Sequence, residues 1–304
     1  QTQRQVDCPA PGGLGGHALN HPLDLRLLPS TWHACLRLGF EHGLRGTVLR
    51  HCTHTGPLYV QKAFYPEGRD VAHAYLLHPP GGMVSGDHLE VSVSAAPQSH
   101  VLVTTPGAGR VYRARADRSL QHLHNHIEVA EQASVEWLPL ETIVYPDAQA
   151  SLNTHISLQA GAKCIAWDVI SLGLPASAQP FSSGSLQQTM QVNIQGRLAL
   201  RERMLLDRQS RDTHAAMAGF QSKPVAGLMI AGPFDTALDE ELESALQVQC
   251  SSTLEGDLSA ITVVGKFVVV RFLGFCSNRA RQTFTECWRL LRPVLLNRPA
   301  CAPG

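Results

Sequence analysis

The sequence predicts a mainly β fold, either a layered β-helix or a sandwich of sheets, with two α-helices in its C-terminal third. Residues 29–208 alternate apolar and polar side chains in the manner of strands that bury one face. Glycine, proline and small polar residues interrupt this alternation every 8–12 residues or so, a spacing typical of sandwiches and β-helices. Helical spacing of apolar residues begins in the last third of the chain.

The clearest strands are Leu89–Val93 and Ile127–Val129, which alternate strictly. Residues 127–135 also resemble residues 156–164, and residues 91–103 form a looser third copy. Starts about 30 residues apart fit stacked strand–turn–strand units. Chance similarity between short strands explains the same pattern, so the sequence leaves both interpretations open.

The two predicted helices differ in how clearly they end. Residues 237–249 form the first, because Leu238, Leu242 and Leu246 recur at helical spacing, and Thr236 is a candidate N-cap.

After a β-branched strand over residues 262–272, residues 277–291 form the second predicted helix. One face of this helix carries Ala280, Phe284, Trp288 and Leu291. Pro293 is expected to end it, because proline cannot donate the next helical hydrogen bond.

Two parts of the chain are predicted, a flexible N-terminal tail over residues 1–28 and one β domain over residues 29–304 that includes both helices. The tail is rich in proline, glycine and glutamine and has little periodicity.

Composition argues against several function classes. The formal net charge is zero, which favours neither a nucleic-acid nor an acidic-membrane partner. No apolar run approaches the ~20 residues of a membrane span, and no signal peptide is expected. The 8 cysteines include no C-x-x-C pair, which fits reduced thiols in the cytoplasm. The low charged fraction of 16% fits either a surface covered by a partner or codon bias.

Two loops carry prolines and glycines that constrain their backbone, and we call them the specified loops. In His78–Asp87 (HPPGGMVSGD), prolines fix the backbone and glycines permit positive φ, which sets Asp87 at the mouth of the following strand. Thr104–Arg110 (TTPGAGR) lacks the G-x-x-x-x-G-K-[ST] pattern, so it offers no lysine to nucleotide phosphates. Thr104 and Thr105 are its polar candidates.

Two carboxylates stand in apolar strands, Glu141 within Trp137–Ile143 and Asp168 within Trp167–Ile170. A charge in such a place must be paired, solvated by an internal channel, or engaged with a cation. The plain structural interpretation is an arginine partner, for which residues 201–203 are the candidates.

His122, His124 and His126 would point to one face of a strand, a spacing that can hold a transition metal. A solvated, histidine-rich face is the alternative, because no carboxylate or cysteine completes the set locally. The sequence contains no Ser-His-Asp grouping, nucleophile elbow or H-E-x-x-H motif, so the chain is predicted not to be an enzyme.

Six segments, taken in order, resemble the urease accessory protein family UreD, also called UreH: residues 56–62, 78–87, 104–110, 137–145, 167–176 and 201–203. Order and spacing match across roughly residues 32–300. Residues 1–28 have no counterpart, and the histidine triplet is not a hallmark of the family.

The resemblance implies a β-helix-type fold with two helices and a chaperone role in urease maturation. It further implies binding to UreF, through it to the GTPase UreG, and docking of this assembly on apo-urease for nickel insertion. No tightly bound cofactor is expected, only transient Ni²⁺. The nickel-path candidates are Asp87, Thr104, Thr105, Glu141 and Asp168.

The two helices and the low charge predict an α-helical partner at the C-terminal region, with Phe284, Trp288 and Arg289 as anchors. Two other function classes stay open. One is a metal-dependent hydrolase that uses the histidine triplet and would retain about one metal per chain. The other is a purely structural interaction module whose carboxylates are only ion-paired.

Overall fold

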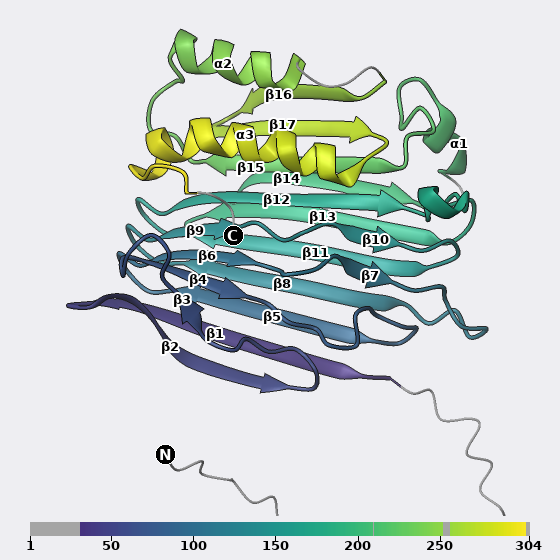
Figure 1. The fold of residues 1–304 in the computed structure, drawn as a ribbon, viewed down its shortest axis with the longest axis horizontal. Helices are drawn as coiled ribbons and strands as arrows, with labels where there is room; N and C mark the ends of the chain where they lie inside the picture. The colour runs from purple at the N-terminus through teal and green to yellow at the C-terminus, as the bar shows by residue number, and fades with distance from the viewer. Residues whose placement is uncertain (1–30, 209, 252–255, 302–304) are drawn as a thin grey trace, which may run out of the picture. The chain divides into compact units, whose positions relative to one another are not determined.

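The alternating segments form two β-sheets in the computed structural model, which describes residues 31–208, 210–251 and 256–301 (Figure 1). Apolar side chains from both sheets meet in one buried core, because alternate residues of each strand point inward. The tail predicted over residues 1–28 lies outside the described residues. Of the helices described, none combines the length and the apolar character needed to cross a membrane.

The first sheet has seven strands in the order β14-β13-β11-β8-β5-β1-β2. Its inner strands pair in parallel, and β2 and β14 pair antiparallel at its two edges. The strands are β1 (His33–Gly43), β2 (Gly46–Thr55), β5 (His88–Ala95), β8 (Gln121–Val129), β11 (Gln149–Leu158), β13 (Ser185–Ile194) and β14 (Arg197–Leu206).

The second sheet follows the order β16-β17-β15-β12-β9-β6-β4-β3, with β10 beside β12 and β7 beside β10. Its first strands are β3 (Ala63–Phe64), β4 (Val71–Tyr75), β6 (His100–Thr104), β7 (Gly109–Val111), β9 (Ser134–Trp137) and β10 (Thr142–Val144). The others are β12 (Lys163–Leu172), β15 (Val225–Gly232), β16 (Leu258–Val264) and β17 (Phe267–Gly274).

Successive strands alternate between the sheets, β5 then β6, β8 then β9, β11 then β12, so that each pair makes one coil of a stack. Ile127 pairs with Ile156, so the similarity between their segments reflects stacked coils rather than chance. In the looser copy Val93, rather than Val91, is the partner of Ile127, so that alignment was out of register by two residues. The predicted fold class, mainly β with β-helix-like layers, is confirmed.

Helices cover the outer face of the second sheet, where α2 (Glu240–Ser251) and α3 (Ser277–Leu296) pack on its antiparallel end (Figure 1). Both predicted helices are therefore confirmed. Two short elements, η1 (Pro175–Ser177) and α1 (Arg211–Ala215), lie in connections.

Two details of the predicted helices were wrong. The N-terminus of α2 is capped by Asp239, whose Oδ1 accepts a hydrogen bond from the Leu242 N–H at 2.7 Å, and not by Thr236. Helix α3 continues through Pro293 to Leu296. Burial of Leu295 against the sheet offsets the hydrogen bond that the proline removes.

The single strand predicted over residues 262–272 was also wrong. It is a hairpin of β16 and β17 whose turn contains Gly265 at a φ of +59°. Glycine adopts this left-handed conformation without steric cost, and this allows the chain to reverse there.

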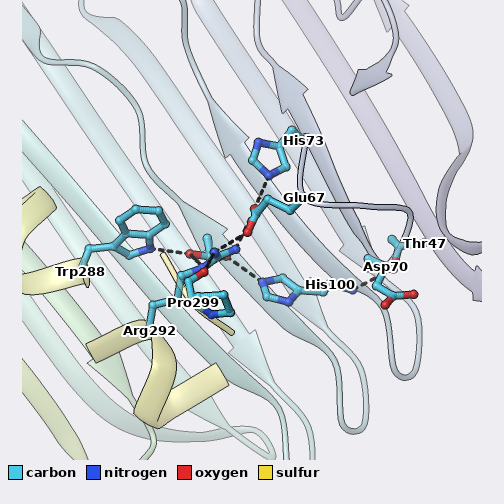
Figure 2. A network of polar contacts seen from close by, with 9 residues as sticks. Thr47, Glu67, Asp70, His73, His100, Trp288, Arg292 and Pro299 are labelled. Atoms are coloured by element: carbon cyan, nitrogen blue, oxygen red, sulfur yellow. Dashed lines mark hydrogen bonds and ion pairs between the residues drawn. The ribbon is translucent and has the colours of Figure 1, made fainter. Parts of the chain in front are cut away.

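Arg292 of α3 is fully buried and holds the helix on the second sheet through two carboxylates (Figure 2). Its guanidinium donates to Glu136 of β9 at 3.0 and 3.1 Å. It also donates to Glu67, which precedes β4, at 2.5 and 2.9 Å. Glu136 accepts further hydrogen bonds from Trp288 Nε1 at 2.5 Å and from His100 Nε2 at 2.7 Å.

The same contacts keep both carboxyls ionised. Burial raises the pKa of Glu67, but hydrogen bonds from Arg292 and His73 outweigh it and bring that pKa to about 2. Burial likewise raises the pKa of Glu136, and the His100 and Arg292 contacts bring it below its ordinary value. A buried cation matched in this way is costly to unpair.

We therefore expect Glu136→Gln to lower the free energy of unfolding by about 3–5 kcal/mol, because it leaves Arg292 incompletely compensated. Urea unfolding measures this change. The matched control is Glu286→Gln, which breaks the exposed pair with Arg289 on the same helix and should change stability by less than about 1 kcal/mol. Equal unfolding midpoints for the two variants would contradict the assigned role of Glu136.

Candidate functional site

The two specified loops and the connection that contains Glu141 are successive connections between the coils, gathered at one end of the stack. Residues 78–87 lead from β4 into β5, residues 104–110 leave β6, and residues 138–148 join β9 to β11. They contact one another through backbone pairing, since β10 pairs with β7 and Met83 bridges to Val111.

The glycine pair in the first of these loops is required by close packing. A Cβ atom at Gly82 would lie 2.5 Å from the Tyr112 ring and 2.9 Å from Arg110. Gly81 has a φ of +75°, which a residue with a Cβ rarely adopts. The loop is therefore fixed against its neighbour by two positions that only glycine fits.

Asp87 is buried at the end of this loop with 3% of its surface exposed. Its Oδ2 accepts a hydrogen bond from the Val84 N–H at 2.8 Å. Among the described residues its Oδ1 is buried without a hydrogen-bond partner. One carboxylate oxygen thus fixes the turn, and the other remains available to a ligand.

Thr104 and Thr105 tie adjacent connections together. The Thr104 hydroxyl donates to the Leu138 carbonyl at 2.7 Å, and the Thr105 hydroxyl accepts from the Leu140 N–H at 2.9 Å. Both threonines line a cavity of about 650 Å³ between the second sheet and α3.

Glu141 has an arginine partner, although it comes from α3 rather than from residues 201–203. Its Oε2 lies 3.4 Å from Arg281 Nε, and its Oε1 accepts from the Ser277 hydroxyl at 3.2 Å. Arg201 and Arg203 donate to glutamines of β13 instead.

A second cavity, of about 820 Å³, lies between the two sheets where β13 and β14 face β15 and β17. Glu202 of β14 and Arg271 of β17 line it and form an ion pair at 2.6 Å. The hallmark segment 201–203 therefore contributes directly to the wall of this cavity.

Asp168 of β12 lies behind the cavity wall. Its Oδ2 accepts a hydrogen bond from Gln188 Nε2 at 3.2 Å, and its strand partner is Leu228; Gln188 and Leu228 both line the cavity. Across the described part of the chain, Asp168 forms no ion pair with arginine or lysine. Burial raises its pKa to about 7, and the Gln188 hydrogen bond offsets only part of that rise.

The histidine triplet lies on the outer face of the first sheet, away from both cavities. His122 and His124 are half-buried and His126 is exposed. Pairing of β8 with its neighbours brings His88 and His155 into the same register rows, and pairing of β1 with β5 adds His33. Sequence spacing could not reveal these three, because they lie on other strands.

The proposed partner anchors divide into two kinds. Phe284 and Trp288 are buried against the second sheet, Trp288 within the Glu136 network. Arg289 is exposed and pairs with Glu286. Of the three, only Arg289 can meet a partner while α3 stays in place.

Glu67, His73 and Cys301 bring potential metal-ligand atoms within 4.8 Å of one another. However, Glu67 already carries two hydrogen bonds from the Arg292 guanidinium. The positive charge of Arg292, within hydrogen-bonding distance of Glu67, repels a metal cation. We therefore assign Glu67, His73 and Cys301 to the structural network around Arg292.

Ionisation of Asp168 should make the free energy of unfolding depend on pH. Its folded pKa of about 7 lies above the ordinary value near 4, so the folded state binds more protons between these values. Stability is then fully present below about pH 4 and falls as pH rises to about 7.

We expect Asp168→Asn to be more stable than the unsubstituted chain at pH 8, by at most about 4 kcal/mol. The side chain keeps some exposure, which makes this an upper limit. The difference should shrink toward pH 4 in chemical unfolding. A variant less stable at pH 8 would instead show that the carboxylate has a stabilising partner.

Comparisons with known proteins identify the family of this chain. Residues 33–304 match the family described as UreD urease accessory protein. The urease accessory protein UreD of Marinomonas sp. (strain MWYL1) is 49% identical over 280 residues, which cover 90% of this chain and 89% of that protein. The urease accessory protein UreD of Nitrosococcus oceani is 38% identical over 283 residues, 93% of this chain and 92% of that protein. The urease accessory protein UreD 2 of Brucella anthropi is 37% identical over 275 residues, 90% of this chain and 97% of that protein. The chain therefore belongs to the UreD urease accessory protein family.

Proposed function

We propose that this chain serves the maturation of urease as a cytoplasmic, non-catalytic scaffold that also gives nickel a passage to the apo-enzyme. In this proposal it binds UreF and, through UreF, the GTPase UreG, which hydrolyses GTP. Membership in the UreD family supports the maturation role. Hydrolysis of GTP or urea by a purified, partner-free sample would overturn the non-catalytic part.

The observation that carries the nickel passage is Asp168, a carboxylate without a cationic partner in the described chain, behind the wall of the inter-sheet cavity. A half-buried carboxylate that is kept without a cationic partner is costly to ionise, which supports a ligand role. A pKa of about 7 lets the same oxygen exchange a proton for a cation near neutral pH.

Oxygen ligands also suit delivery better than a histidine or cysteine cage. Ni²⁺ lies near the top of the affinity order for nitrogen and sulfur sites, so such a cage would retain it. A passage must bind the ion well enough for entry and weakly enough for release. We propose Asp168 and the unpartnered oxygen of Asp87 as ligands of the ion. The other candidates do not border the inter-sheet cavity, because Thr104 and Thr105 line the cavity beside α3 and Glu141 pairs with Arg281.

The decisive variant for the nickel passage is Asp168→Asn, which keeps the side-chain shape. We expect it to fold, to retain UreF in a pull-down, and to lower the nickel content of co-expressed urease. The control is Asp235→Asn, which removes a largely exposed carboxylate paired with Lys163. Normal nickel loading with Asp168→Asn would exclude Asp168 from the passage; loss of UreF retention would favour the purely structural interpretation.

For the partner, we propose that UreF docks over the exposed side of α3 around Arg289. Arginine is over-represented among residues that dominate binding energy. Arg289→Glu should weaken UreF retention without changing thermal stability, because Arg289 is exposed. Arg298→Glu serves as the control, since Arg298 lies beyond α3 and pairs with Asp70. Equal retention by both variants would remove Arg289 from the interface.

A further inference from the structure

The outer face of the first sheet carries a continuous array of histidine rings, contributed by four adjacent strands. The array consists of His33 on β1, His88 on β5, His122, His124 and His126 on β8, and His155 on β11. Neighbouring rings lie with centroids 5.2–6.4 Å apart along the whole array. Parallel pairing in register creates it, because alternate residues of each strand face outward.

Three of these rings form a closed triangle. The centroid of His88 lies 5.2 Å from that of His122 and 5.4 Å from that of His124, and the last two are 5.9 Å apart. A metal ion about 2.1 Å from a nitrogen of each of two imidazoles, at tetrahedral angles, holds the ring centroids about 5 Å apart. The spacing of the three rings is therefore close to that of three imidazoles on one ion.

The His88 and His124 rings are stacked, with planes 10° apart, and the His122 ring is tilted to them by 34° and 37°. In this arrangement the ring nitrogens do not converge on one point. Binding then requires only side-chain rotation, since the backbones are fixed by strand pairing. Glu90 is the candidate fourth ligand, because it is the register partner of His124 and lies two residues from His88 on the same face.

The environment favours the ligand form of the rings. Burial lowers the pKa of His122 and of His124, and the neighbouring rings lower both further, while Glu90 partly offsets the effect at His124. Unprotonated imidazole is the form that coordinates metals. Imidazole nitrogens favour nickel, copper and zinc over magnesium and calcium.

We propose that His88, His122 and His124, together with Glu90, form a surface site for one divalent transition-metal ion. This site goes beyond the proposed passage, because it lies on the outer face of the first sheet and Asp168 lies between the sheets. Because imidazole nitrogens bind transition metals tightly, the site holds an ion at the surface and does not conduct it.

Equilibrium dialysis of the purified full chain against Ni²⁺ tests the site. The variant His88→Gln/His122→Gln/His124→Gln should lose one bound equivalent per chain. The matched control is His42→Gln/His51→Gln/His54→Gln, which removes three exposed histidines of β1 and β2. The control should keep that equivalent, and so should Asp168→Asn, which separates this test from that of the passage.

A second measurement uses Co²⁺ as a probe, because its visible absorption bands report coordination. The unsubstituted chain should develop bands that His124→Gln alone lowers, and this single variant serves if the triple variant does not fold. Unchanged Ni²⁺ stoichiometry in a folded triple variant would overturn the proposal. An equal loss in the control would also overturn it, because binding would then follow histidine number rather than this triangle.

Discussion

The C-terminal part of the fold depends on one buried charge, the guanidinium of Arg292. Its two carboxylate partners come from β9 and from the connection before β4, and it also donates to the Pro299 carbonyl. One side chain thus joins the central coils, the last helix and the C-terminal segment (Figure 2). A buried guanidinium cannot lose its charge by deprotonation. Arg292 therefore needs its carboxylate partners whenever α3 packs on the sheet.

With α3 held in this way, the cavities follow from the architecture. The helix closes the outer face of the second sheet and leaves the 650 Å³ cavity beside the connecting loops. Beyond β12 and β13 both sheets continue with antiparallel strands, and the 820 Å³ cavity lies between these strands. Asp168 lies where the filled core ends and this cavity begins.

The sequence allowed the fold class to be predicted because strand alternation and helical spacing are local. It also located the specified loops, because their prolines and glycines constrain the backbone locally, although the contacts that require Gly82 come from Arg110 and Tyr112 of another connection. Register could not be predicted to the residue, as the two-residue offset of Val91 shows. The turn at Gly265 was missed although its glycine is a local turn signal, whereas the helix runs through Pro293 because tertiary packing outweighs the effect of the proline.

The candidate site was less predictable for the same reason. The Arg281 partner of Glu141 lies 140 positions away in sequence, and Trp288 donates a hydrogen bond to Glu136, 152 positions away. His88 joined the histidines of β8 only through sheet register. Asp168 is different: a carboxylate inside an apolar run already indicated an unusual environment.

The proposed passage of nickel through the inter-sheet cavity is tested most directly by filling that cavity. Ala226 lines the cavity, so Ala226→Phe would occupy it with a ring. The measurement is the nickel content of urease matured with this variant, once normal UreF retention and thermal unfolding are established. The account predicts urease that is largely free of nickel. Fully loaded urease from a folded, partner-bound Ala226→Phe chain would contradict it.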